Sequence, residues 1–223
     1  MLVKESLPRQ MFKILKEEII FQENPNLLMG YKFNEAEIAK RFGCSVTPVR
    51  ECMNMLRQTG LIVGESYQSS SVVRFDAKRV SEAFELRACL ELWALDKAFS
   101  SLGENEIAKM KRIQVDYKNA YLNFNQREIV QYNWDFHLVT FEKADNNLFT
   151  ELIRTIEDQI SMMRAPIAKR RKADNDIDEL MIPIKEHDEI ILAFEEHNKE
   201  KAEAALLAHV NRIKDDCLSL YSN

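Results

Sequence analysis

The chain has 223 residues, of which 46% are hydrophobic and 30% are charged, and its formal net charge is −5. This composition is typical of a soluble globular protein with one large or two small domains, and the low content of 5 Gly and 5 Pro favours long helices over a turn-rich β fold. No apolar run reaches the ~18 residues that span a bilayer, and the N-terminus lacks the apolar core of a signal peptide. These features exclude a membrane-spanning protein, and we expect a cytoplasmic one.

The charge is unevenly distributed along the chain. Residues 1–75 contain 10 Lys and Arg against 8 Asp and Glu, a balance of +2, and the remaining residues have a balance of −7. A slightly basic N-terminal part followed by an acidic C-terminal part is typical of a protein that contacts DNA through its N-terminal part only. The four cysteines are far apart, without the spacing of a zinc ribbon, and are expected to be reduced: Cys44, Cys52, Cys89 and Cys217.

The first 75 residues are expected to form a winged helix-turn-helix domain. Apolar periodicity and turn residues predict three helices and then two short β segments, at about 7–22, 34–42, 45–59, 61–63 and 71–74. Asn34 is expected to cap the second helix, and Gly43 to end it. Three helices followed by a two-stranded ribbon are the element order of a winged helix.

The turn between the second and third helices carries the strongest local signal. Ala39 is small enough for the two helices to approach closely, and Gly43 supplies the positive φ that the turn needs. Val49 and Cys52 are spaced to bury against the preceding helix. This pattern predicts a helix-turn-helix, with an ordinary αα-corner as the alternative.

A recognition helix enters the major groove with its N-terminal residues. Arg50 fits either a guanine or a phosphate. Ser45 is also explained as a helix N-cap, and Lys40 and Arg57 as solvated charges. The predicted DNA-contacting residues are Lys40, Ser45, Val46, Thr47, Arg50, Arg57, Gln68 and Ser69.

Residues 76–223 are expected to form an all-α domain of about six helices, so the predicted fold class is mainly α. The helices are predicted at about 77–102, 104–125, 127–144, 146–171, 183–198 and 199–221. The acidic segment 174–179 is predicted to connect the fourth and fifth of these helices. Pro183 is expected in the first turn of the fifth, where its missing amide costs least.

Three histidines occupy apolar surroundings on three of these helices: His137, His187 and His209. Asn133 lies four residues before His137, on the same helix face. Three inward-facing histidines in a helical bundle suggest a first-row transition-metal site, and hydrogen-bonded core histidines are the alternative. His197 lies in a charged stretch and is expected to be solvated.

The segment Ile38–Leu61 resembles the helix-turn-helix of the GntR family of bacterial regulators. The resemblance is carried by the core Thr47–Glu51, with Leu56 and Gly60 in phase. The C-terminal part looks like the FadR-type ligand-binding domain, called FCD, so the resemblance covers nearly the whole chain. Two departures stand out, because Val46 replaces an arginine that contacts DNA in the family, and the predicted wing tip, 67–71, lacks the usual glycine.

The resemblance also implies a metal site. Many FadR-type domains bind a metal through an aspartate four residues before a first histidine, and through two further histidines. Here His137, His187 and His209 match those histidines, whereas Asn133 stands at the aspartate position. An amide oxygen is a neutral, weaker ligand, so either the affinity for a divalent zinc, nickel or manganese ion falls, or an anionic effector completes and neutralises its shell.

Two arginines are predicted to bind the effector. Arg87 lies in a match to the family's L-R-x-x-L-E motif, where similar proteins hold an organic acid with a bidentate arginine. A salt bridge with Glu91, four residues on, is the alternative. Arg164 is the second candidate.

The sequence therefore predicts a homodimeric, non-enzymatic regulator that binds a palindromic DNA operator and responds to a small carboxylate. A metal-dependent enzyme is one alternative, with Glu186 or Asp188 as the base, but it leaves the first 75 residues unexplained. A helical interaction protein with a degenerate DNA-binding head is the other, suggested by Val46 and by the predicted wing.

Overall fold

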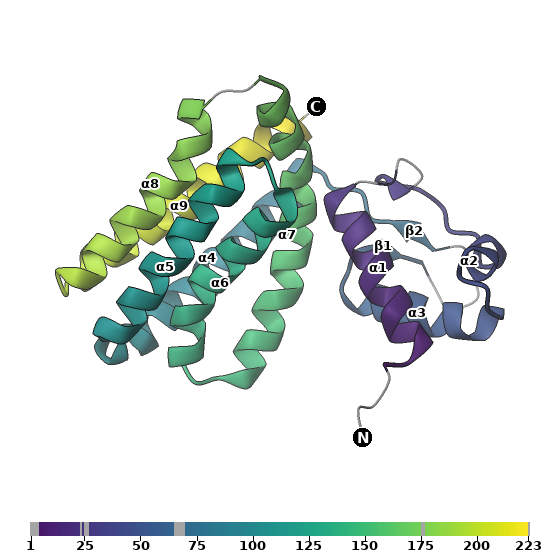
Figure 1. The fold of residues 1–223 in the computed structure, drawn as a ribbon, viewed down its shortest axis with the longest axis horizontal. Helices are drawn as coiled ribbons and strands as arrows, with labels where there is room; N and C mark the ends of the chain where they lie inside the picture. Colours follow the sequence, from purple (N-terminus) through teal and green to yellow (C-terminus); the bar gives the residue numbers. More distant parts are fainter. Residues whose placement is uncertain (1–4, 23, 25–26, 65–69, 175–176, 223) are drawn as a thin grey trace. The chain divides into compact units, whose positions relative to one another are not determined.

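The computed structural model describes residues 5–22, 24, 27–64, 70–174 and 177–222 (Figure 1). The described chain is mainly α-helical and contains one two-stranded antiparallel sheet, which confirms the predicted fold class. Contacts between Cα atoms divide it into two compact units. One comprises Met1–Phe75 with Ser161–Ala165, and the other Asp76–Ile160 with Pro166–Asn223. No helix in the described ranges is both long and apolar enough to span a bilayer.

The N-terminal unit contains three helices, α1 (Leu7–Phe21), α2 (Glu35–Phe42) and α3 (Val46–Gln58). The Asn34 side chain accepts hydrogen bonds from two backbone amides in the first turn of α2, as predicted for its N-cap. Gly43 ends α2 in the left-handed conformation, with φ of 63°. These two caps confine α2 to two turns, and they fix the start of the turn that leads into α3.

A small sheet completes the N-terminal unit. Strands β1 (Ile62–Val63) and β2 (Ser71–Val72) pair in antiparallel fashion, with Ile62 opposite Val72. The other edge of β2 pairs with the segment that precedes α2, because Gly30 N donates to Val72 O at 2.9 Å and Val72 N to Tyr31 O at 2.9 Å. The predicted ribbon therefore lies with β2 between β1 and residues 30–33.

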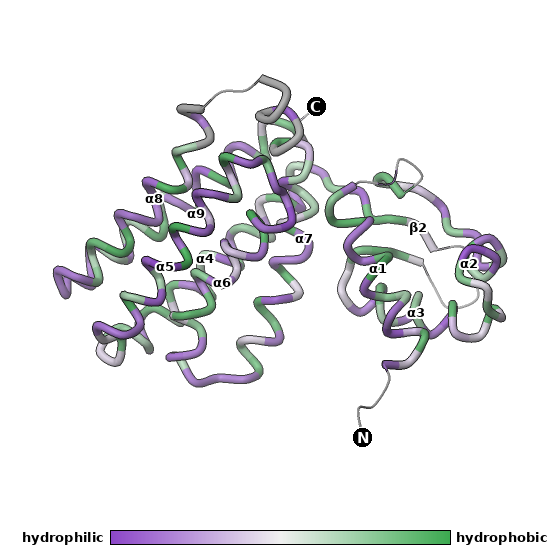
Figure 2. The backbone as a smooth tube through the Cα atoms, viewed as in Figure 1, coloured by the Kyte–Doolittle hydropathy of each residue, from purple (hydrophilic) through white to green (hydrophobic). Residues whose placement is uncertain are grey.

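The C-terminal unit is a helical bundle with one short 3₁₀ segment, η2 (Phe99–Ser101). Its helices are α4 (Ala77–Ala98), α5 (Glu104–Leu122), α6 (Gln126–Lys143), α7 (Asn147–Asp174), α8 (Ile177–Glu195) and α9 (Lys199–Tyr221). Helix α4 packs against α6 and α9, α5 packs against α6 and α8, and α8 packs against α9. Hydrophobic and hydrophilic residues alternate along these helices in Figure 2, as expected where each buries one face.

The prediction for the start of α8 was wrong. Helix α7 extends to Asp174 and α8 begins at Ile177, so the predicted acidic connector 174–179 is mostly helical. Pro183 lies inside α8 and not in its first turn. Proline removes one helical hydrogen bond, but the residues after it bury firmly in the core, with Ile184 3% exposed and His187 fully buried. Packing of this face offsets the local cost, which sequence periodicity alone does not reveal.

Candidate functional site

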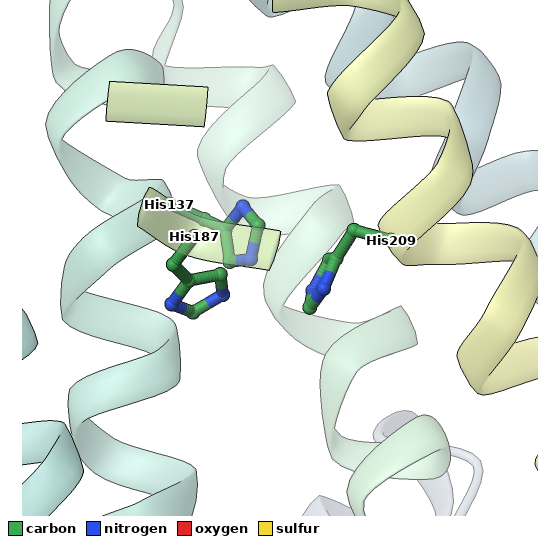
Figure 3. Close-up of side chains that lie close together, drawn as sticks. All are labelled: His137, His187 and His209. Carbon is green, nitrogen blue, oxygen red and sulfur yellow. The ribbon is translucent and has the colours of Figure 1, made fainter. Parts of the chain in front are cut away.

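Three histidine side chains converge inside the C-terminal unit. His137 comes from α6, His187 from α8 and His209 from α9, and Figure 3 shows their rings close together. His137 is 6% exposed, whereas His187 and His209 are fully buried. Each can offer one ring nitrogen such that all three nitrogens lie within 4.8 Å of one another. Nitrogen ligands of one metal lie roughly 3–3.5 Å apart, so modest side-chain rotation would bring these three onto a single ion.

Each of the three rings has its Nδ1 atom close to an oxygen of another side chain. His137 Nδ1 lies 2.9 Å from Glu91 Oε2, and His209 Nδ1 lies 2.8 Å from Glu186 Oε2. A carboxylate oxygen accepts hydrogen bonds, so in the hydrogen-bonded pair of His209 and Glu186 the Nδ1–H group donates. The proton of a neutral His209 ring is therefore on Nδ1, and Nε2 carries the lone pair that a metal requires. The Glu91 carboxylate lies on the same side of His137 at ion-pair distance.

The Nδ1 atom of His187 also lies beside a side-chain oxygen, in this case that of a glutamine. Its Nδ1 lies 3.2 Å from Gln114 Oε1. The Gln114 amide is oriented by its own donor, because Nε2 donates to Ile184 O at 2.6 Å and to Asp188 Oδ1 at 3.0 Å. Its oxygen therefore faces His187 and accepts from Nδ1–H. The ring is also stacked on Phe136, with centroids 4.0 Å apart. Hydrogen bonds thus orient the buried imidazoles of His187 and His209, and the buried His137 lies beside the Glu91 carboxylate.

Asn133 lies beside this cluster and is 1% exposed. Tyr117 Oη donates to Asn133 Oδ1 over a long distance of 3.4 Å. Within the described part of the chain, Asn133 Nδ2 makes no hydrogen bond. Asn133 and His137 line one pocket together, as their spacing on α6 predicted, while coordination of a metal by the amide stays a prediction.

Arg87 is buried, 1% exposed, in an ion-pair network with two carboxylates. Its Nε donates to Glu91 Oε1 at 2.5 Å, and Nη1 lies 3.6 Å from Glu157 Oε2. Burial opposes the ionisation of Glu91, but Arg87 and His137 outweigh it and hold the pKa of this carboxyl well below its usual range. The structure thus contains the Arg87–Glu91 salt bridge considered from the sequence, and Arg87 also lines the pocket of Asn133 and His137.

Sequence reasoning missed two participants, Gln114 and Glu157, and effector binding by Arg164 stays a prediction. Gln114 and His187 are 73 residues apart, and Glu157 reaches Arg87 from a different helix. No local motif marks such pairs. Arg164 is half-buried and is not among the residues that line the pocket beside His137.

The predicted DNA-contacting residues lie around α2 and α3. Lys40, Ser45, Thr47 and Arg50 are exposed, while Val46 is half-buried. Arg50 Nε donates to Glu35 Oε2 at 2.9 Å, an ion pair between α3 and α2. Ser45 is the N-cap residue of α3, but its side chain makes no capping hydrogen bond.

Arg57 has a role that the sequence did not suggest. Its Nη1 donates to Ser70 Oγ at 2.6 Å, and its Nη2 donates to Asn54 Oδ1. These bonds tie the last turn of α3 to the residue that precedes β2, so Arg57 supports the position of the sheet. Gln68 and Ser69, the predicted contacts at the wing tip, lie outside the described residues.

Comparison with known proteins agrees with this architecture. Residues 82–212 match the family model of the FCD domain. The chain is 27% identical over 209 residues to the HTH-type transcriptional regulator YdhC of Bacillus subtilis, covering 93% of this chain and 88% of the relative. It is 22% identical over 191 residues to the Nta operon transcriptional regulator of Aminobacter aminovorans, with 86% of each chain covered.

Solved structures show the same fold. The McbR/YncC protein of Escherichia coli superimposes with a TM-score of 0.79 at 19% identity, covering 98% of this chain and 100% of the other. A GntR regulator of Rhodococcus sp. RHA1 superimposes with a TM-score of 0.77 at 18% identity, covering 97% and 100%. The matched domain, the fold and the relatives agree with the helix-turn-helix at residues 38–52, and the chain belongs to the GntR family of transcriptional regulators with a C-terminal FCD domain.

Proposed function

We propose that this regulator binds a palindromic DNA operator as a homodimer, and that a small molecule held at a divalent metal in the FCD domain sets its affinity for the operator. The metal is bound by His137, His187 and His209, with Asn133 as a neutral fourth ligand, and zinc, nickel and manganese all suit this set. The observation that carries the proposal is the convergence of the three buried rings, with Nδ1 of each close to an oxygen of another side chain, so that Nε2 can serve as the ligand atom.

The chemistry of this set explains why an effector is expected. Three neutral imidazoles and an amide leave the full +2 charge of the ion uncompensated in a buried site, which is unfavourable. An anionic group of the effector, such as a carboxylate, completes the shell and lowers this cost. Arg87, in the adjacent pocket, is the second group that contacts the bound molecule.

An effector acts on DNA binding only if it binds two conformations of the dimer with different affinity. We infer that its binding changes the relative placement of the two recognition helices, which approach the two half-sites of the operator. The proposed contacts to DNA come from the exposed residues at the start of α3, Ser45, Thr47 and Arg50, with Lys40 on α2.

The test is selection of bound sequences from random duplex DNA, followed by affinity measurements on the enriched sequence. We expect a palindromic consensus, and we expect Arg50→Ala to bind it at least about tenfold more weakly, because one charged base or phosphate contact is lost. The Arg50–Glu35 pair is exposed, so this variant should keep its stability. Lys78→Ala, on the exposed surface of α4, is the matched control.

Three results contradict the proposal. They are the absence of any enriched sequence, an Arg50→Ala variant that binds as tightly as the parent, and an operator affinity that is the same for metal-loaded and metal-free protein across a panel of small carboxylates. The first would favour a helical interaction protein with a degenerate DNA-binding head.

A further inference from the structure

The pocket beside His137 lies between α4, α6 and α7 and has a specific polar lining. Its walls are formed by Arg87, Glu91, Asn133, Trp134, His137, Phe141, Ile153 and Glu157. The space free of atoms, counted out to the mouth of the pocket, is about 180 Å³. The interior leaves no space as large as a water molecule, so a ligand has to displace lining side chains to enter.

Several buried polar atoms in this wall make no hydrogen bond within the described chain, among them an acceptor on Glu157 and a donor on Asn133. Glu157 is 8% exposed; its Oε2 faces Arg87, whereas its Oε1 has no hydrogen-bond partner. Asn133 Nδ2 is another such atom. Buried polar groups are rarely left without partners in a protein that has no ligand to bind there.

The two carboxylates of the pocket are not paired equally. Arg87 faces both Glu91 and Glu157, but it lies closer to Glu91, at 2.5 Å, than to Glu157, at 3.6 Å. Glu157 is therefore the less closely paired of the two. A buried carboxylate oxygen that lacks a hydrogen-bond donor is costly, and an ammonium group of a ligand would supply one.

We propose that the effector is a small zwitterion of the amino-acid type, whose ammonium group pairs with Glu157. This inference rests on the proposed function, because the anionic end of the same molecule faces the metal and accepts from Asn133 Nδ2. Glu157 thereby selects amino compounds over hydroxy and unsubstituted acids of the same skeleton. Arg87 keeps its ion pair with Glu91 through Nε and positions the two carboxylates.

The test uses two matched sets of compounds that differ only at one carbon. Alanine, lactate and propionate carry an ammonium, a hydroxyl or a hydrogen there, and aspartate, malate and succinate form the larger set. Calorimetric titration of the metal-loaded full chain should show the amino member of at least one set binding about tenfold or more tighter than the other two, since a charge-assisted hydrogen bond is gained.

Variants identify the residue responsible. Glu157→Gln should abolish the preference for the amino compound, and Glu157→Asp, which keeps the charge, should retain part of it. Glu151→Gln, an exposed position on the same helix, should behave as the parent. Metal content and operator binding are measured on the same preparations, so that loss of either is seen separately.

The inference is overturned if the hydroxy or unsubstituted acids bind as well as the amino compounds, if no amino compound binds at millimolar concentration, or if Glu157→Gln leaves the preference intact. Loss of metal from Glu157→Gln would also overturn it, because Glu157 would then be a metal ligand. A parent protein with neither metal nor operator binding would instead refute the proposed function.

Discussion

At the scale of single residues, the candidate metal site depends on side chains that do not face the metal. Glu186 accepts from His209 Nδ1 and is itself held by Arg212, whose Nη2 donates to Glu186 Oε2 at 2.9 Å. Arg212 also donates to Asp216 at 2.7 Å. This chain of charge-assisted bonds fixes the carboxylate, and through it the orientation of the His209 ring.

Replacing Glu186 by Gln should therefore weaken metal binding by about 10- to 100-fold while all three histidines remain. The amide is a weaker acceptor, and its NH₂ group can face Nδ1 and favour the wrong tautomer of His209. Competition with a chromophoric chelator measures the affinity. Glu189→Gln, an exposed position on α8, is the control and should bind metal as the parent does. Equal affinity in both variants would show that the ring needs no support from Glu186.

The residues of the site differ in how far the sequence could predict them. His137, His187 and His209 are recognisable because apolar neighbours at helical spacing make them face inward. Glu91 is recognisable as a partner of Arg87 four residues earlier on the same helix. Gln114 and Glu157 are not, because their contacts join helices whose mutual rotation no local pattern specifies.

At the scale of elements, the winged-helix segment was predicted closely and α8 was not. Asn34 and Gly43 are short-range signals, since each acts on amides or carbonyls within its own turn. The start of α8 is not marked locally, because the helix continues through Pro183 and the residues after the proline bury in the core. Sequence rules for helix ends thus worked where the cap is local, and they failed where packing overrides a local breaker.

Gly43→Ala should destabilise the N-terminal unit by about 1–2 kcal/mol, which is the cost of holding a residue with a Cβ atom in the left-handed conformation. An added Cβ would meet no atom within 4 Å, so backbone conformation is the whole effect. Gly43→Asn should cost less, because asparagine tolerates this conformation. Hydrogen exchange of peptides from residues 34–59 reports this unit separately from the rest of the chain. An unchanged protection in Gly43→Ala would contradict the φ of 63° at this turn.

At the scale of the whole molecule, the residues that are expected to bind DNA and those that are expected to bind a metal lie in different parts of the sequence, which also differ in charge. Residues 1–75 carry the net positive charge and the helix-turn-helix, whereas the acidic remainder contains the histidine cluster. The relatives that span most of the chain are transcription regulators, which accords with the first part. The second part explains what such a regulator would sense, provided that the cluster holds a metal.

Elemental mass spectrometry of the untagged full chain tests this central claim most directly. We predict near-stoichiometric zinc, nickel or manganese in the parent, and loss of the metal in His187→Ala. His197→Asn is the matched control, because His197 is exposed and asparagine tolerates its φ of 49°. It should retain the metal. A parent without metal, even after incubation with each of the three ions, would contradict the account and leave the three histidines as hydrogen-bonded walls of the pocket.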